Sequence, residues 1–220
     1  MSQVPSVEEM IGRIQPKRKI EGNSAILLPF DSSGAPDYEG LAAHIKRTSD
    51  AGLTPAVNMD TGYVNLLDDE IRRRVLQTTR ETLGPDGSFI AGAFIEGKEG
   101  DPAALYRQEI AVIREFGGTP IIFQCSAMKG MDAKERVALY REVAQRNGPL
   151  LAFELGEMFA PFGSIWDDET ARGIMEIPEI VGYKHSSLDR QKEWERLAMR
   201  DAVRPEFKIY TGNDLAIDMG

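Results

Sequence analysis

The sequence predicts an α/β fold of parallel strands, the (β/α)8 barrel of the triosephosphate isomerase type, of which about seven βα units can be written. Short apolar runs, each of a length that suits a buried strand, recur about every 30 residues along the chain. They start near Ala25, Leu53, Phe89, Pro120, Leu150, Ile180 and Phe207. Polar segments with helical periodicity separate them, so strand and helix alternate, as parallel strands with right-handed crossovers require.

The expected helices follow the strands in order and have recognisable ends. Four segments place apolar residues on one helical face, within residues 38–45, 71–76, 106–113 and 137–144. Asp37, Asp101 before Pro102, and Asp132 are typical residues at helix starts. Glycines that suit helix ends follow at Gly52, Gly84, Gly117 and Gly148. Each predicted strand is therefore followed by a helix that can cover the sheet.

Two features favour a closed barrel over an open doubly wound sheet. The turn after the first strand, residues 31–35, lacks the Gly-x-Gly-x-x-Gly fingerprint of a dinucleotide-binding sheet. Polar residues instead follow several successive strands, which is how a barrel assembles its site. We expect residues 1–19 to form an N-terminal arm and residues 20–220 to form the barrel domain. This domain is expected to be truncated at its C-terminal end, because no eighth strand can be written.

Composition narrows the functional class. The net charge of −9 and the pI near 4.9 oppose binding to nucleic acid or to anionic membranes, so a small-molecule partner is expected. The N-terminus has no apolar signal core, and no apolar stretch approaches the roughly 20 residues of a membrane span, which favours a cytoplasmic protein. The single cysteine, Cys125, excludes an internal disulfide and is expected to be a free buried thiol.

Lys184 closes a short apolar strand in Ile180–Ser187 and is the most informative residue of the chain. A lysine that faces a barrel interior is partly desolvated, which favours the neutral amine that attacks a carbonyl group. This position predicts a Schiff-base enzyme. The alternative is a lysine whose head reaches solvent at the strand end. The neighbouring His185 should point to the opposite face of the strand, between sheet and helix.

Three segments resemble the pyruvate-dependent class I aldolases that include dihydrodipicolinate synthase and N-acetylneuraminate lyase. Residues 58–63, Asn-Met-Asp-Thr-Gly-Tyr, are similar to the family's Asn-Gly-Thr-Thr-Gly-Glu loop. Residues 181–187 resemble the segment that carries the Schiff-base lysine, and residues 210–214 resemble the later Ser-Gly-Asp-Asp turn. The resemblance covers the chain from about Ile20 onward and implies a (β/α)8 barrel in which Lys184 forms the imine.

The resemblance also assigns substrate-binding residues. It implies that the amides around Thr61 and Gly62 hold a substrate carboxylate, with Gly212 and Asn213 in the later turn. Asp60 would repel a carboxylate, so it could contact a hydroxyl group of a sugar-like substrate or cap the following helix. Gln124 could bind substrate hydroxyls, or satisfy loop amides.

One departure from the family concerns proton transfer. Phe153 stands where the family has a tyrosine that relays protons, so it is expected among the substrate-binding residues, but a phenyl ring cannot relay a proton. Glu154 beside it is therefore the first candidate for the general acid or base, and the alternative is an outward-facing carboxylate with a basic partner. Tyr63 is a further candidate for the relay, although a loop tyrosine more often packs.

Together these observations predict a Schiff-base-forming lyase, an aldolase, synthase or dehydratase, that acts on pyruvate or a related 2-oxo sugar acid through Lys184. No cofactor beyond the lysine imine is expected, and the family resemblance implies a homo-oligomer, a dimer or tetramer. Two other classes stay open: a non-catalytic barrel used for binding or assembly, and a divalent-metal-dependent aldolase. The ligands of such a metal would come from Asp60, Glu154, Glu157 and His185.

Overall fold

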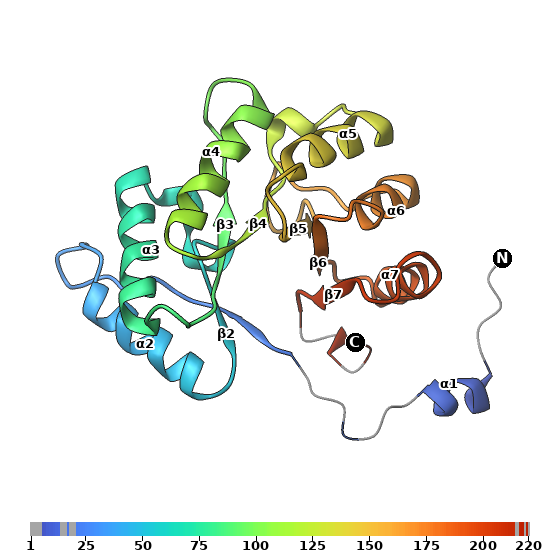
Figure 1. Ribbon diagram of the computed structural model, residues 1–220, viewed down its shortest axis with the longest axis horizontal. Helices are drawn as coiled ribbons and strands as arrows, with labels where there is room; N and C mark the ends of the chain where they lie inside the picture. Colours follow the sequence, from blue (N-terminus) through green and yellow to red (C-terminus); the bar gives the residue numbers. More distant parts are fainter. Residues whose placement is uncertain (1–5, 14–16, 18–20, 214–215, 218, 220) are drawn as a thin grey trace.

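A computed structural model describes residues 6–13, 17, 21–213, 216–217 and 219. Its centre is a seven-stranded sheet in which every neighbouring pair is parallel and the strand order follows the chain, from β1 to β7. The strands are β1 (Asn23–Ala25), β2 (Thr54–Val57), β3 (Ile90–Ala93), β4 (Thr119–Ile122), β5 (Leu150–Leu155), β6 (Ile180–Ser186) and β7 (Lys208–Thr211). The sheet curls into an open half-barrel, which confirms the predicted fold class (Figure 1).

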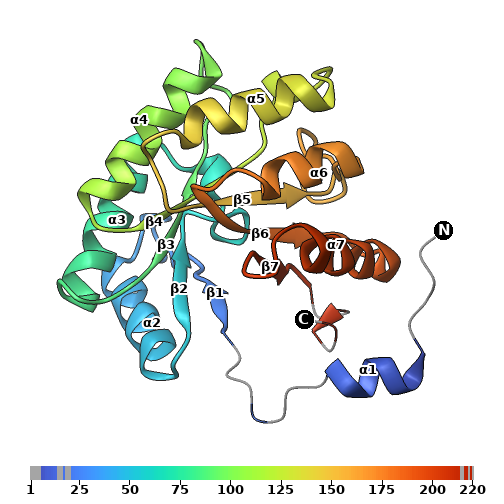
Figure 2. The same ribbon diagram turned by 45° about the vertical axis from the view of Figure 1, so that its right-hand side comes forward.

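The helices form an outer layer around this sheet, as the two views show (Figures 1 and 2). They are α2 (Tyr38–Asp50), α3 (Asp69–Leu83), α4 (Pro102–Glu115), α5 (Ala133–Ala144), α6 (Asp168–Met175) and α7 (Arg190–Val203), and α1 (Val7–Arg13) precedes the sheet. Short 3₁₀ turns at Asp60–Gly62, Val64–Leu66 and Ser126–Met128 follow β2 and β4. Within the described residues, none of these helices combines the length and apolar character needed to cross a bilayer.

Alternation along the strands divides the core into two apolar clusters. The outer cluster packs the sheet against the helices and includes Ile122, Ala152 and Tyr183. The inner cluster fills the concave side of the half-barrel, and its strand residues include Ile121 and Phe153. A side chain from an inner position therefore faces the interior, and its neighbour in sequence faces the helices.

The predicted helix starts are confirmed. The side chains of Asp37, Asp101 and Asp132 accept hydrogen bonds from the amides of Gly40, Ala104 and Glu135 at 2.9 Å each, and Glu135 returns a bond to complete a capping box.

Two predicted boundaries are wrong. The first strand runs from Asn23 to Ala25, so it precedes most of the apolar run that starts near Ala25. The fifth helix ends at Ala144, four residues before Gly148.

The predicted N-terminal arm, residues 1–19, contains α1, whereas residues 1–5, 14–16 and 18–19 lie outside the described part of the chain.

Candidate active site

Lys184 lies near the C-terminal end of β6, on the inner face of the sheet. The parallel register pairs it with Phe153 on β5 and with Tyr210 on β7, and both neighbours belong to or pack against the inner cluster. Its side chain is 21% exposed, so the amine is largely removed from water. The expectation that Lys184 faces the barrel interior is confirmed.

An aromatic floor lies beneath the amine. Nζ of Lys184 sits 4.2 Å from the ring centre of Phe153. That ring packs edge-to-face on Phe123 at 4.9 Å, and Phe123 in turn packs on Phe94 at 5.5 Å. The π face of Phe153 stabilises the ammonium form while the apolar surroundings exclude water. Phe153 thus serves as a supporting surface for the lysine.

Within the described residues, Asp60 is the only residue that forms an ion pair with Lys184. It opens the 3₁₀ turn after β2, and its Oδ1 lies 3.5 Å from Nζ of Lys184. Oδ1 is buried and has no hydrogen-bond partner within the described residues. The free lone pairs of this carboxylate can therefore accept a hydrogen from a bound molecule.

Two opposing effects set the pKa of Lys184. Burial lowers the pKa because the charged amine loses hydration, and the neighbouring Asp60 carboxylate raises it. Burial is the larger effect, so the pKa of Lys184 lies below the ordinary lysine value. A larger fraction of the amine is therefore neutral and nucleophilic at a given pH than in an exposed lysine.

This balance predicts the pH dependence of imine formation. The rate with a carbonyl probe should rise with pH and level off below the ordinary lysine pKa of about 10.4. Asp60→Asn removes the charge that raises the pKa of Lys184, so the inflection should move to lower pH. Asp50→Asn, which changes an exposed partner of Lys46, should leave it in place. An unchanged or higher inflection in Asp60→Asn would contradict the assignment, and trapping rates over a pH series measure it.

The loop around Asp60 places backbone close to the interior. Gly62 is buried, and a β-carbon there would lie 2.9 Å from the carbonyl oxygen of Ile26, so the turn requires glycine. Thr61 is exposed beside it. Tyr63 adopts a left-handed conformation with φ of 60° and is 51% exposed. The carboxylate-binding role of Thr61 and Gly62 stays a prediction.

Glu154 lies on the opposite face of β5 from Phe153, and its predicted role as general acid or base is wrong. Its carboxylate is fully buried towards the helices and accepts hydrogen bonds from the amide of Trp166 and from Arg196, both at 2.9 Å, and from His185. Burial alone raises the pKa of Glu154, but the bonds from His185 and Arg196 outweigh it and hold the pKa below the usual value. The alternative interpretation, a carboxylate with a basic partner, is the correct one.

These residues belong to a buried polar network behind the strands of the site, which comprises Glu154, His185, Glu193 and Arg196 and ends at the exposed Asp168. His185 faces the helices as predicted, with its Nε2 3.8 Å from Oε2 of Glu193. Arg196 is fully buried and also pairs with Asp168 at 2.9 Å. The network links β5 and β6 to α6 and α7, so it fixes the two strands that carry Phe153 and Lys184.

The same arrangement removes the basis for the metal alternative. Glu154 and His185 point to the helices, whereas Asp60 points to the interior, so the sheet separates the expected ligands. In the described part of the chain, no three His, Cys, Asp or Glu side chains are grouped to hold a metal ion.

Gln124 is a structural residue rather than a substrate ligand. It is 1% exposed, its Nε2 donates to the carbonyl oxygen of Ser164 at 2.8 Å, and its Oε1 accepts from the Ser164 hydroxyl at 2.9 Å. Its predicted role in reading substrate hydroxyls is wrong because both ends of its amide bind the loop after β5.

Gly212 and Asn213 lie directly after β7 and bind the end of β6. The Gly212 amide donates to the carbonyl oxygen of His185 at 2.7 Å, and a β-carbon on Gly212 would lie 2.0 Å from the hydroxyl of Ser186. The Asn213 side chain donates to the carbonyl oxygen of Ser187. Both residues thus fasten the segment that follows Lys184, and a contact with substrate stays a prediction. Asp214, the last residue of this turn, lies outside the described residues.

Tyr210 is an interior residue to which sequence analysis gave no role. Its ring packs against the inner cluster, whereas Ile209 packs on the outer one. Burial raises the pKa of Tyr210, so its hydroxyl stays protonated. The alternation of β7 could have identified this residue, because the turn at Gly212 fixes where the strand ends.

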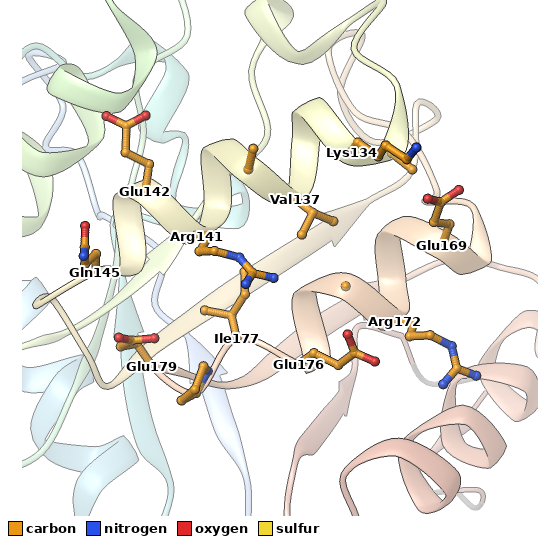
Figure 3. Close-up of a pocket in the computed structure, with 14 residues that line it drawn as sticks. Lys134, Val137, Arg141, Glu142, Gln145, Glu169, Arg172, Glu176, Ile177 and Glu179 are labelled. Atoms are coloured by element: carbon orange, nitrogen blue, oxygen red, sulfur yellow. The ribbon is translucent and has the colours of Figure 1, made fainter.

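A separate groove lies on the helical side of the sheet. It has a volume of about 840 Å³ and runs between α5 and α6, lined by residues that include Val137, Arg141, Arg172 and Ile177 (Figure 3). No residue that contacts Lys184 lines it. This groove is therefore separate from the site around Lys184.

Comparisons with known proteins agree with this architecture. A scan of protein families gives no match. Two curated proteins named 4-hydroxy-tetrahydrodipicolinate synthase are similar: one from Synechococcus sp. (strain CC9902), 26% identical over 196 residues, and one from Kosmotoga olearia, 23% identical over 218 residues. Each match covers 87% of this chain, and the chain spans 61% and 63% of the length of these relatives.

Solved structures show the same fold at lower identity. A monomeric dihydrodipicolinate synthase variant superposes with a TM-score of 0.77 and 16% identity, covering 91% of this chain and 67% of that one. A prophage protein of the dihydrodipicolinic acid synthase family from E. coli K12, solved in complex with pyruvate, gives 0.75 and 15%, covering 88% and 63%. These comparisons confirm the resemblance: the chain is similar to the dihydrodipicolinate synthase family, at the low identity of a divergent member.

Proposed function

We propose that this protein is a Schiff-base-forming lyase in which Lys184 attacks the carbonyl group of a small substrate. The observation that carries the proposal is the amine of Lys184, which is largely buried, has a lowered pKa and lies against Phe153 and Asp60. The similarity to enzymes named 4-hydroxy-tetrahydrodipicolinate synthase supports a lyase. A related structure contains pyruvate, which makes small carbonyl compounds the first substrates to test.

The geometry supports two different roles, nucleophile for Lys184 and proton carrier for Asp60. Neutral Lys184 adds to the carbonyl carbon, and loss of water from the adduct gives a protonated imine. Asp60 is close enough to take a proton from the Lys184 ammonium before the attack and give it to the carbonyl oxygen as the adduct forms. It can then move one proton from the adduct nitrogen to the hydroxyl group, which departs as water. The protonated imine then accepts the electron pair of a bond that breaks at the neighbouring carbon. No further cofactor is part of this proposal.

Reductive trapping tests the proposal. The protein is incubated with a panel of small carbonyl compounds and sodium borohydride, and the intact mass is measured beside a Lys184→Met variant. We expect a mass increase of one reduced adduct in the parent protein and none above background in the variant. An equal increase in both proteins, or none in either, would reject the Schiff-base function and favour the non-catalytic alternative. The oligomeric state, expected to be a dimer or tetramer, stays a prediction.

A further inference from the structure

Asp60 places a constraint on the substrate of the proposed reaction. An imine formed on Lys184 from a 2-oxo acid carries the substrate carboxylate on the imine carbon, so its oxygens lie within about 4 Å of Nζ. Oδ1 of Asp60 already lies 3.5 Å from the same nitrogen. Two carboxylates would therefore share one side of a largely buried site, where like charges repel strongly.

The charges around the site do not compensate for a second carboxylate. A protonated imine carries one positive charge, which Asp60 balances. Within the described residues, the partly buried cations Arg72 and Lys98 are held elsewhere, because both pair with Asp69 and Glu109. Apart from Tyr210, which has an uncharged hydroxyl group, the interior cluster beside Lys184 is apolar and includes Phe153 and the phenylalanines that pack on it. A neutral substrate leaves the site balanced, whereas a 2-oxo acid leaves it one negative charge in excess.

Asp60 can also bind a hydroxyl group of the substrate. Its Oδ1 is buried, and its contact with Nζ of Lys184 is long at 3.5 Å, so the carboxylate can accept a further hydrogen bond from a hydroxyl group of a bound molecule. In a β-hydroxy carbonyl compound, this hydroxyl is the group that loses its proton during carbon–carbon cleavage. Asp60 would take that proton, the bond between the α and β carbons would break, and its electron pair would enter the imine to give an enamine and a free aldehyde.

We infer that Asp60 determines specificity, so that the site takes a neutral hydroxy-aldehyde or hydroxy-ketone and discriminates against 2-oxo acids. This inference rests on the proposed Schiff-base function and names its substrate class. It replaces the expectation of pyruvate or a 2-oxo sugar acid with a carbonyl compound that has hydroxyl groups and no carboxylate beside the carbonyl. The argument depends on the position of one carboxylate relative to Nζ of Lys184.

A pair of three-carbon ketones tests the inference. Hydroxyacetone and pyruvate are trapped with cyanoborohydride, and occupancy of Lys184 is read from its peptide, with Lys184→Met as background. In the parent protein, hydroxyacetone should reach half-saturation at a concentration at least about tenfold below that of pyruvate. Asp60→Thr removes the charge and should lower the value for pyruvate at least about tenfold, and Asp60→Asn, which keeps the shape, should do the same.

The outcomes separate the two claims. If the parent protein traps pyruvate as readily as hydroxyacetone, and Asp60→Asn leaves the ratio unchanged, the specificity role of Asp60 is wrong while the Schiff-base function stands. If neither ketone labels Lys184 in any variant, the Schiff-base function fails, and this inference fails with it. Circular dichroism of each variant shows whether the fold is kept, and the isosteric Asp60→Asn provides the test if Asp60→Thr does not fold.

Discussion

Replacing Lys184 with methionine is expected to lower the turnover of any trapped substrate on the order of 10⁴-fold or more, because the covalent route disappears with its nucleophile. Methionine keeps an unbranched chain on the inner face of β6 and can pack against Phe153, so the fold should be retained. Turnover is measured as aldehyde or ketone released from the substrate that traps best.

A variant of an exposed lysine is the control for this result. Lys46 is exposed on α2 and pairs only with Asp50 within the described residues, so Lys46→Met removes a lysine without touching the interior. We expect its turnover to equal that of the parent protein. If Lys184→Met kept turnover within about tenfold of the parent protein, the covalent mechanism would be excluded.

Replacing Arg196 with methionine is expected to destabilise the protein by about 3–5 kcal/mol, because it leaves the buried Glu154 carboxylate without its guanidinium partner. Glu154 and Arg196 are both fully buried, and Arg196 also binds Asp168 and the carbonyl oxygen of Trp166. The free energy of unfolding, measured by urea denaturation, should fall accordingly. Thermal unfolding should show the same order of stability.

The control is a surface ion pair of similar length. Arg107 and Glu142 are both exposed, so Arg107→Met should cost at most about 1 kcal/mol. Equal effects of Arg107→Met and Arg196→Met would show that the buried network does not fix β5 and β6. A large effect of Arg196→Met alone supports its role in holding the strands that carry the site.

The sequence predicted the fold because the patterns that indicate strands and helices are both local. Strand length, helix spacing and the capping aspartates depend on neighbouring residues only, and they predicted the seven strands and the first four covering helices, α2 to α5, whereas α6 and α7 were not identified individually. The position of Lys184 also followed from local pattern, since it closes an apolar strand. His185 was correctly assigned to the opposite face by the alternation of side chains along a strand.

The errors arose where contacts depend on distant segments. Glu154 was taken as an interior carboxylate because the strand parity of β5 was not fixed, and a shift of one residue reverses the direction of every side chain. Gln124 binds a loop about 40 residues later in the chain, and no local sequence pattern predicts this contact. The approach of Asp60 to Lys184 likewise depends on the curl of the sheet, which brings the loop after β2 towards β6.

The central claim is that Lys184, among all the lysines of the chain, forms the covalent intermediate. Peptide mapping of the protein after trapping with hydroxyacetone and cyanoborohydride tests it most directly. The account predicts a reduced adduct on the peptide that contains residues 180–187, located on Lys184 by fragmentation and protected by competing substrate. An adduct spread over exposed lysines such as Lys46, with Lys184 unmodified, would contradict it.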